Sequence, residues 1–330
     1  MIIDFRPRSR DKMTLVGVIS NRNWILGNWL KEVLRRSPSN FQLSWTPFIY
    51  SGKRKLERIV PSLIQKGSSY FFSYPTLFEY HLKRNSSEFL NRSIVLYPHS
   101  EPEMGSLEHQ VQILNQAFCT YFFCSADAEV LIQRGLDRTK AKIAYCAVDV
   151  DCVPSENFTR DPNTIVMASK FGPRKGLQLL PQLVAQMPNY NFIALGRGWE
   201  DFIEKSNLKN LKNFRYIEFN KSTRNEYFSK ATYFLSVSLL EGGPVPLIEA
   251  MALGCIPIAT KTGFAPDLIA NGENGILLST NPSVEDVKEG ITAAHSLSSK
   301  ALETPLTWDR ITSMMIADKR LIESFPQIRS

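Results

Sequence analysis

Short apolar runs alternate with helical stretches along almost the whole chain, and this alternation constrains the fold more than any other feature. The runs are rich in β-branched and aromatic residues, whereas the stretches between them have helical periodicity. Such a pattern is typical of repeated βα units, in which helices join parallel strands. The sequence therefore predicts an α/β protein with mostly parallel, doubly wound sheets.

The apolar runs fall into two groups with a polar segment between them. The predicted strands of the first group are residues 13–20, 41–50, 69–75, 92–98, 120–125 and 142–148. Those of the second group are residues 164–169, 189–195, 213–219, 233–239, 255–260 and 275–279. Residues 149–162 contain proline and lack periodicity, which is typical of a linker.

A chain of 330 residues is long enough for two domains. We expect a Rossmann-like domain over residues 1–150 and a second one over residues 151–315. Residues 307–325 are amphipathic, with apolar side chains at Ile311, Met314, Met315 and Leu321, and predict a terminal helix. Its part from about residue 316 to 330 can pack on the first domain. Two such domains facing each other would enclose a cleft at the carboxyl ends of their strands.

The net positive charge is confined to the first half of the chain. Through Val150 there are 20 Lys and Arg against 13 Asp and Glu, and the remainder has 19 of each. The basic clusters in residues 6–12 and 53–58 could attract an anionic lipid surface, an acidic acceptor or nucleic acid, and a solvated basic face explains them equally well. Because no nucleic-acid-binding motif is recognised, we expect no nucleic acid partner.

The location of the protein is predicted from what the sequence lacks. No apolar run approaches the roughly 20 residues that span a bilayer, and the first residues are charged where a signal peptide needs an apolar core. We expect a cytoplasmic protein that can contact the inner face of an anionic membrane through its basic first half. The five cysteines lack paired spacing, which favours reduced and mostly buried thiols.

Residues 236–278 carry the strongest functional signal. A predicted strand ending near Leu240 is followed by the turn Glu241-Gly242-Gly243 and by a helix that Gly254 ends. Pro244 and Pro246 suit the first turn of that helix, where missing amides are tolerated. Free amides, glycines and the positive end of a helix together make a site for an anion such as a diphosphate. Glu249 lies about two turns further along the helix, at about 1.5 Å per residue.

This stretch resembles the retaining GT-B glycosyltransferases of the family 4 type. Their E-x7-E motif matches Glu241 and Glu249, and the surrounding EAMALGCIPIAT and NGENGILL also match the family pattern. In that family the first glutamate contacts the transferred sugar and the second binds the ribose hydroxyls. Amides of the loop between them hold the donor sugar and phosphate. The resemblance thus implies a catalytic role for Glu241 and donor binding by Glu249 and by Gly242, Gly243, Pro244 and Val245.

A second motif lies upstream, in residues 164–198. It has a strand, a basic loop, a helix and another strand, and it resembles the family loop in which two cations contact the donor diphosphate. Lys175 matches the lysine before a glycine, whereas either Lys170 or Arg174 could supply the second cation. Lys170 stands where the family has an arginine, and lysine is a point charge that cannot fork across two oxygens.

Three further positions are predicted by resemblance. Gly196 and Arg197 lie where the family often contacts the nucleotide, although a plain turn explains them equally well. His99 follows a predicted strand and resembles the family histidine that lies against the transferred sugar. Gly27 is the single glycine of SNRNWILGN, which stands for the family's glycine-rich loop after the first strand. The family loop has a pair of glycines and this segment has one, so the sequence does not predict which acceptor-side contacts Gly27 makes.

These features predict the transfer of a sugar from a nucleoside-diphosphate sugar to a hydroxyl of a glycan, a lipid-linked glycan or a small molecule. No metal-ligand spacing is found, and Asp149-Val150-Asp151 lies in the linker. We therefore expect no metal and no cofactor. The departing diphosphate would be stabilised by Lys175, by Lys170 or Arg174, and by the helix amino terminus. The alternatives are a GT-B sugar-nucleotide epimerase and a non-catalytic sugar-nucleotide-binding subunit.

Overall fold

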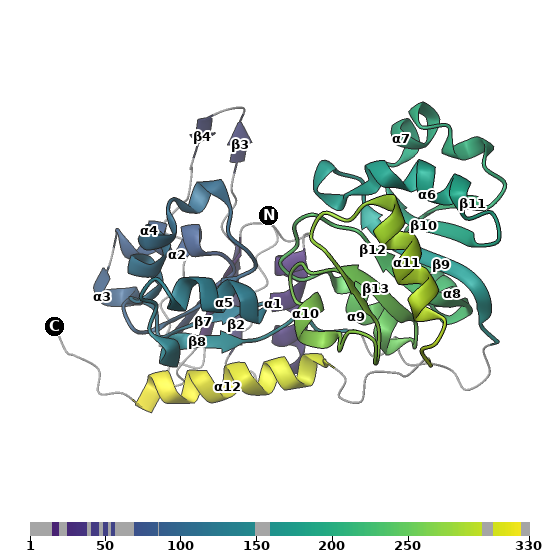
Figure 1. Ribbon diagram of the computed structural model, residues 1–330. Coiled ribbons are helices and arrows are strands. Elements are labelled where there is room, and N and C mark those ends of the chain that lie inside the picture. The colour runs from purple at the N-terminus through teal and green to yellow at the C-terminus, as the bar shows by residue number, and fades with distance from the viewer. Residues whose placement is uncertain are drawn as a thin grey trace. The chain divides into compact units, whose positions relative to one another are not determined.

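The structure, a computed structural model, describes residues 15–19, 25–37, 41–45, 49–51, 54–56, 69–84, 86–148, 159–298 and 306–324. The chain divides into two units, each built on a parallel sheet that carries helices (Figure 1). Unit 1 contains Met1–Tyr145 together with Trp308–Ser330, and unit 2 contains Cys146–Thr307. The predicted α/β class is confirmed by both sheets.

The points at which the chain passes between the units differ from the predicted boundaries. The first lies at Tyr145/Cys146 rather than after residue 150, and the second lies at Thr307/Trp308 rather than after residue 315. Within the predicted linker, residues 149–158 lie outside the described part of the chain. Asp161 and Pro162 already belong to the first strand of unit 2.

Unit 1 is built on a sheet of parallel strands in the order β2-β1-β5-β6-β7-β8. These strands are β1 (Leu15–Ile19), β2 (Phe41–Trp45), β5 (Ser69–Phe72), β6 (Ser93–Tyr97), β7 (Cys119–Phe122) and β8 (Ala141–Ile143). The strand predicted over residues 41–50 is in fact two, because β2 is followed by β3 (Ile49–Ser51). Strand β3 pairs with β4 (Arg54–Leu56) in a separate antiparallel hairpin. Pro47, between β2 and β3, has no amide hydrogen for a ladder bond.

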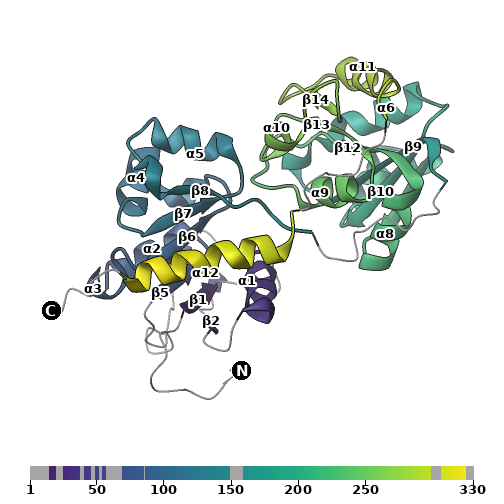
Figure 2. The same ribbon diagram turned by 90° about the horizontal axis from the view of Figure 1, so that it is seen from below.

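Helices cover both faces of the unit 1 sheet (Figure 2). They are α1 (Ile25–Arg36), α2 (Pro75–Leu82), α3 (Ser86–Phe89), α4 (Leu107–Leu114), α5 (Ser125–Ile132) and α12 (Trp308–Ser324). Successive residues of a strand point to opposite faces. Tyr70 and Phe72 accordingly pack in the core beneath α2, α4 and α5, whereas Phe71 stacks on Trp29 of α1 with ring centroids 5.4 Å apart.

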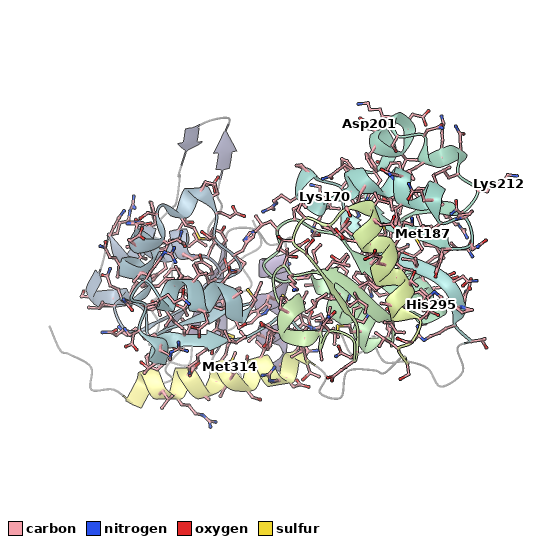
Figure 3. The ribbon with its side chains drawn as sticks, in the orientation of Figure 1. Lys170, Met187, Asp201, Lys212, His295 and Met314 are labelled. Atoms are coloured by element: carbon pink, nitrogen blue, oxygen red, sulfur yellow. The ribbon has the colours of Figure 1, made fainter. Side chains whose placement is uncertain are left out.

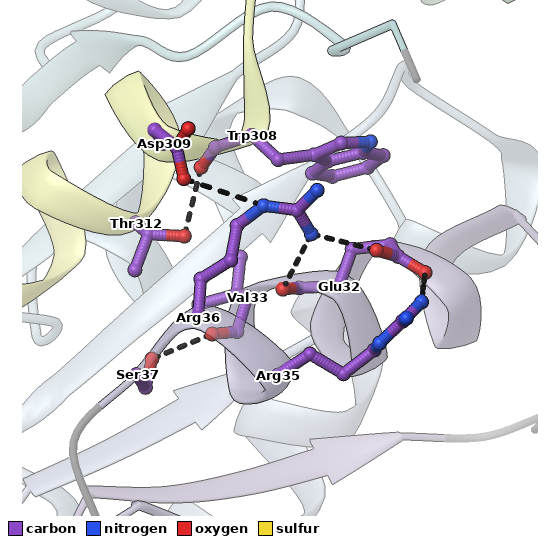
Figure 4. A network of polar contacts seen from close by, with 8 residues as sticks. All are labelled: Glu32, Val33, Arg35, Arg36, Ser37, Trp308, Asp309 and Thr312. Carbon is purple, nitrogen blue, oxygen red and sulfur yellow. Dashed lines mark hydrogen bonds and ion pairs between the residues drawn. The ribbon is translucent and has the colours of Figure 1, made fainter. Parts of the chain in front are cut away.

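Helix α12 joins unit 1 although it follows unit 2 in the sequence. At its start, Arg36 of α1 bonds Glu32 through Nη1 and Oε2 at 2.7 Å and approaches Asp309 of α12 through Nε and Oδ1 at 3.3 Å (Figure 4). Ile311 and Met315 are buried as expected, but Leu321 is 50% exposed and Ile322 is buried instead. The buried face therefore continues one residue later than the predicted stripe.

Unit 2 is built on a sheet of parallel strands in the order β11-β10-β9-β12-β13-β14. They are β9 (Asp161–Lys170), β10 (Asn191–Arg197), β11 (Phe214–Glu218), β12 (Ala231–Ser236), β13 (Ile256–Thr260) and β14 (Ile276–Leu278). Counted along the chain, this is the 3-2-1-4-5-6 order of the dinucleotide-binding fold. The strand order reverses between β9 and β12.

The helices of unit 2 also lie on both faces of its sheet, with α6 and α11 on one face and α8 and α9 on the other (Figure 2). They are α6 (Leu180–Gln186), α7 (Glu200–Lys205), α8 (Lys221–Lys230), α9 (Val245–Ala252), α10 (Ala265–Leu268) and α11 (Val284–Ala294). The predicted end of α9 is confirmed, because Gly254 follows it with a φ of 86°. Only glycine adopts such a left-handed conformation at little cost.

Two further expectations concern thiols and membrane spans. Cys119, Cys124, Cys146 and Cys255 are free and buried, as predicted, and Cys152 lies outside the described residues. Within the described parts of the chain, none of the helices combines the length and the apolar character that a bilayer crossing requires.

Candidate functional site

The loops that follow β9 and β12 meet at the point where the strand order of unit 2 reverses. In open α/β sheets this point forms a crevice at the carboxyl ends of the strands, where ligands bind. Both predicted donor motifs lie there, because the basic loop follows Lys170 at the end of β9 and Glu241 follows Ser236 at the end of β12. The fold thus brings together two motifs that are far apart in the sequence.

Close backbone packing joins the two loops. Gly176 has a φ of +65°, and a Cβ atom there would lie 2.0 Å from the carbonyl oxygen of Val237. The amide of Leu239 also donates to the carbonyl oxygen of Arg174 at 2.7 Å. As a result, the Lys175 ammonium forms an ion pair with the Glu241 carboxylate. The side chains of Lys175 and Glu241 remain 28% and 14% exposed, so both can be reached by a ligand.

The turn after Glu241 requires glycine for packing. A Cβ atom on Gly243 would lie 2.8 Å from Cε1 of Phe264 and 3.1 Å from the Cys146 sulfur. Pro244 is the residue before α9 and has no amide hydrogen, so Gly243 and Val245 supply the amides at this helix start. These amides and the positive end of α9 favour a negatively charged group.

Glu249 lies in the second turn of α9 and is 7% exposed. Its Oε1 atom accepts a hydrogen bond of 2.5 Å from Nη1 of Arg224 in α8, which is 2% exposed. The Glu249 charge also acts on the Cys146 thiol, whose pKa is raised first by burial and then by this carboxylate. Arg224 is not predicted from the sequence, because a single arginine in the polar segment KSTRNEYFSK carries no signal of burial.

Lys170 and Arg197 lie at the carboxyl ends of neighbouring strands, where they are paired in the register of β9 and β10. Both are exposed, as is Arg174, so these three cations line the same edge of the sheet as Lys175. Figure 3 shows Lys170 apart from Lys212. Lys212 precedes β11 and so lies toward the edge of the sheet at which the strands begin.

Gly196 has a packing role at the end of β10. A Cβ atom on Gly196 would lie 2.2 Å from the carbonyl oxygen of Ser169 and 2.3 Å from Nε1 of Trp199. That indole nitrogen donates to the same carbonyl oxygen at 2.8 Å. Close packing of Trp199 therefore explains why position 196 holds glycine.

In unit 1, the predicted residue His99 and the unpredicted residue Asp127 follow the carboxyl ends of β6 and β7. His99 follows β6, and its Nε2 lies 3.3 Å from Oε1 of Glu101. Asp127 lies in the first turn of α5, after β7. Burial raises the pKa of Asp127, and the nearby His99 acts in the opposite direction with a smaller effect. Asp127 is not predicted from the sequence, since an acidic residue in a first helical turn is common on helix dipole grounds alone.

Two remaining predictions concern Gly27 and metal ions. Gly27 lies inside helix α1 rather than in the loop after β1, and residues 20–24 of that loop lie outside the described part. Helix α1 therefore contains the one glycine that was assigned to the loop. In the described residues, no group of three or more His, Cys, Asp and Glu side chains is arranged to hold a metal ion.

The matched sequence family covers most of unit 2. Residues 153–304 match the profile of the family described as glycosyl transferases group 1. This match covers a little less than half of the chain and shows that unit 2 is similar to members of that family. Both glutamates and all of the cations assigned to the donor site lie within the range that matches this family.

Comparison with curated proteins finds relatives that match part of the chain. Over 202 residues it is 32% identical to a Homo sapiens protein that is named as one of the subunits of phosphatidylinositol N-acetylglucosaminyltransferase. The match covers 58% of this chain and 40% of that protein. The chain spans less than half the length of the first curated relatives that it matches.

Comparison with solved structures shows that the fold is GT-B. Anabaena HepE in complex with UDP and glucose has a TM-score of 0.69 at 14% identity, over 95% of this chain and 100% of that one. Sucrose-phosphate synthase from Thermosynechococcus elongatus has a TM-score of 0.73 at 14% identity, again over 95% and 100%. The predicted fold of two Rossmann-like domains is confirmed.

Proposed function

We propose that the chain is a retaining glycosyltransferase, which moves a sugar from a nucleoside-diphosphate sugar to a hydroxyl acceptor. The observation that carries the proposal is the Lys175 and Glu241 ion pair at the strand-order reversal, beside the amino terminus of α9. A cation and free amides suit a diphosphate, and a carboxylate suits sugar hydroxyls. The match of residues 153–304 to the glycosyl transferases group 1 profile supports this assignment.

The ion pair implies an exchange of partners when the donor binds. Without donor, Glu241 neutralises Lys175. The diphosphate carries more negative charge than one carboxylate and competes for Lys175, together with the amides of Gly243 and Val245. Glu241 is then released to accept hydrogen bonds from the sugar. Lys170 or Arg174 supplies the second cation.

Stabilisation of the leaving group is the main catalytic effect that these residues can provide. As the bond from the sugar carbon to the phosphate oxygen breaks, negative charge grows on the diphosphate, where Lys175 and the start of α9 are already directed. We propose that the acceptor attacks from the face that the phosphate leaves, with the phosphate as the base that takes its proton. His99 lies against the sugar in this proposal, as the family resemblance implies.

The proposed acceptor is a hydroxyl of a glycan or a lipid-linked glycan. The human relative is named for transfer to a phosphatidylinositol, which supports a lipid acceptor, and the structure of HepE with UDP and glucose makes UDP the first nucleotide to test. We also propose a cytoplasmic location with peripheral membrane contact, supported by the excess of 20 basic over 13 acidic residues through Val150.

A thermal-shift screen of UDP-, GDP- and ADP-sugars tests the donor site. One donor is expected to raise the melting temperature, since ligand at 100 times its Kd stabilises the folded state by about 2.7 kcal/mol. Lys175→Met should remove most of the shift, whereas Lys212→Met, a distant exposed lysine, should keep it. EDTA should leave the shift unchanged if no metal takes part. A full shift in Lys175→Met would contradict the proposal.

Incubation with donor separates the transferase from its alternatives. An epimerase changes the sugar of the donor when no acceptor is present, and a non-catalytic protein binds the donor but releases no nucleoside diphosphate with any acceptor. A transferase releases the diphosphate in proportion to the glycosylated product, and the anomeric configuration of that product reports retention.

A further inference from the structure

The buried contact between Arg224 and Glu249 links the first turn of α8 to the second turn of α9. Arg224 Nη1 donates to Glu249 Oε1 at 2.5 Å, and Arg224 Nε donates to Asn225 Oδ1 at 2.9 Å. Because α8 follows β11 and α9 follows β12, both helices begin at the carboxyl edge of the sheet. The ion pair therefore lies on the side of unit 2 where the donor site is formed.

Holding the two helices together does not by itself require this ion pair. Near the opposite ends of α8 and α9, Arg160 donates to the carbonyl oxygens of Phe228 at 3.1 Å and of Leu253. Replacing a buried ion pair by apolar side chains is often neutral or stabilising. Glu249 also has apolar buried neighbours in α9, namely Leu247, Ile248, Ala250 and Met251. An apolar pair would suit this interface as well.

We propose that Arg224 is a positioning residue for nucleotide recognition, which holds the Glu249 carboxylate ionised and oriented toward the ribose hydroxyls of the donor. This inference rests on the proposed function, in which Glu249 binds the ribose. A buried carboxylate without a cation would take up a proton and lose acceptor capacity. Arg224 prevents this, because its guanidinium stays charged at any pH that the folded protein experiences.

The chemistry of a carboxylate allows both contacts at once. Its two oxygens offer about four lone-pair sites, so a hydrogen bond from Arg224 to Oε1 still leaves Glu249 able to accept from hydroxyl groups. The planar guanidinium fixes the carboxylate in one orientation, which a flexible ammonium does not. The pair is electrically neutral, so it suits an uncharged diol.

Nucleotide binding to the full chain, measured by calorimetry, tests the inference. The probes are UDP, GDP and ADP, each compared with its 2′-deoxy and 3′-deoxy counterparts. The wild type is expected to bind one ribonucleotide at least about tenfold more tightly than the deoxy forms, as for a hydrogen bond to a charged group. Arg224→Met should weaken the ribonucleotide and bring this ratio close to one. The matched control is Lys230→Met, which removes an α8 cation paired with exposed Glu226 at 2.8 Å and should keep the wild-type ratio.

Two more variants keep the test decisive if Arg224→Met, which removes the arginine partner of Glu249, fails to fold. Arg224→Lys retains the charge and should fold, with the ratio reduced several-fold because lysine does not fix the carboxylate. The double variant R224M/E249M removes both charges of this ion pair and should fold, with a ratio near one. A wild-type ratio in a folded Arg224→Met or in Arg224→Lys would overturn this inference alone. Failure of the wild type to bind any of the nucleotides would overturn the proposed function, and this inference with it.

Discussion

His81 is a buried histidine that is neutral in the folded protein. It is 3% exposed, its ring lies near the rings of Phe72, Tyr80 and Phe89, and burial, aided by the Arg84 charge, lowers its pKa to about 4. In the unfolded chain its pKa is about 6.5. Between these two pKa values the unfolded chain binds the extra proton, so unfolding becomes easier as the pH falls.

The expected loss of stability from His81 is about 2–3 kcal/mol between pH 7 and pH 4, since one pKa unit corresponds to about 1.4 kcal/mol. Denaturant unfolding of the wild type and of His81→Leu across this range measures it. The wild type should lose more stability than the variant, which has no proton to take up at this position. Parallel pH profiles for the two proteins would show that His81 is not the cause.

At the proposed donor site, the sequence alone indicates candidate residues but not how their side chains pair. Glu241, Glu249 and Lys175 are found from local motifs, because each motif lies within one short segment. Arg224 and its ion pair with Glu249 join positions 25 residues apart through the packing of two helices. No local pattern encodes that contact, and polar neighbours in α8 favour a solvated interpretation of the arginine.

Helix α12 is held on unit 1 by a buried carboxylate. Asp318 accepts a hydrogen bond of 2.6 Å from the hydroxyl group of Tyr121 in β7 and forms an ion pair with Lys142 in β8. Burial is the largest cause that raises the pKa of this Tyr121 hydroxyl group. Asp318 therefore connects one helix to two adjacent strands.

Asp318→Ala should destabilise unit 1 by about 2–4 kcal/mol, because it leaves the Tyr121 hydroxyl and the Lys142 ammonium without this partner. Asp318→Asn keeps an acceptor oxygen and should lose less. Chemical unfolding monitored by tryptophan fluorescence measures both, since Trp29 and Trp308 lie 6.2 Å apart at this junction. Equal losses in the two variants would contradict a contribution from the remaining acceptor oxygen.

The elements themselves are well predicted where periodicity is strong, and less well at their ends. The strands of both sheets occur where apolar runs indicate them, whereas the division of residues 41–50 into β2 and β3 is not predicted. The buried face of α12 includes the polar residues Asp318 and Lys319. A hydrophobicity pattern assigns polar residues to the solvent face, so the predicted apolar stripe differs from the buried face at this end of the helix.

At the scale of the whole molecule, the units differ in the number of chain segments that form them. Unit 2 is one segment, and the two points where the chain leaves it lie side by side, joined by a parallel bridge between Val148 and Thr307. Unit 1 is formed from two segments that are separated by all of unit 2. Residues 146–307 contain the sheet of unit 2 and all of its helices, whereas residues 1–145 contain the sheet of unit 1 but lack its helix α12.

Expression of the separate segments tests this difference. Residues 146–307 alone should fold cooperatively, with protected amides in hydrogen exchange. Residues 1–145 should fold only when residues 308–324 are supplied, because α12 packs on α1 and β5, and its absence exposes part of the Phe71 face of the sheet. Cooperative unfolding of residues 1–145 by themselves would contradict the expectation.

The discontinuity of unit 1 has a consequence for protein synthesis. A ribosome makes residues 1–145 first, but the helix that covers one face of their sheet emerges only after all of unit 2. Unit 2 can therefore reach its native state on the nascent chain earlier than the unit that precedes it. A chain released before residue 308 carries a folded unit 2 and a partly uncovered apolar sheet in unit 1, and such a sheet is a substrate for chaperones and proteases.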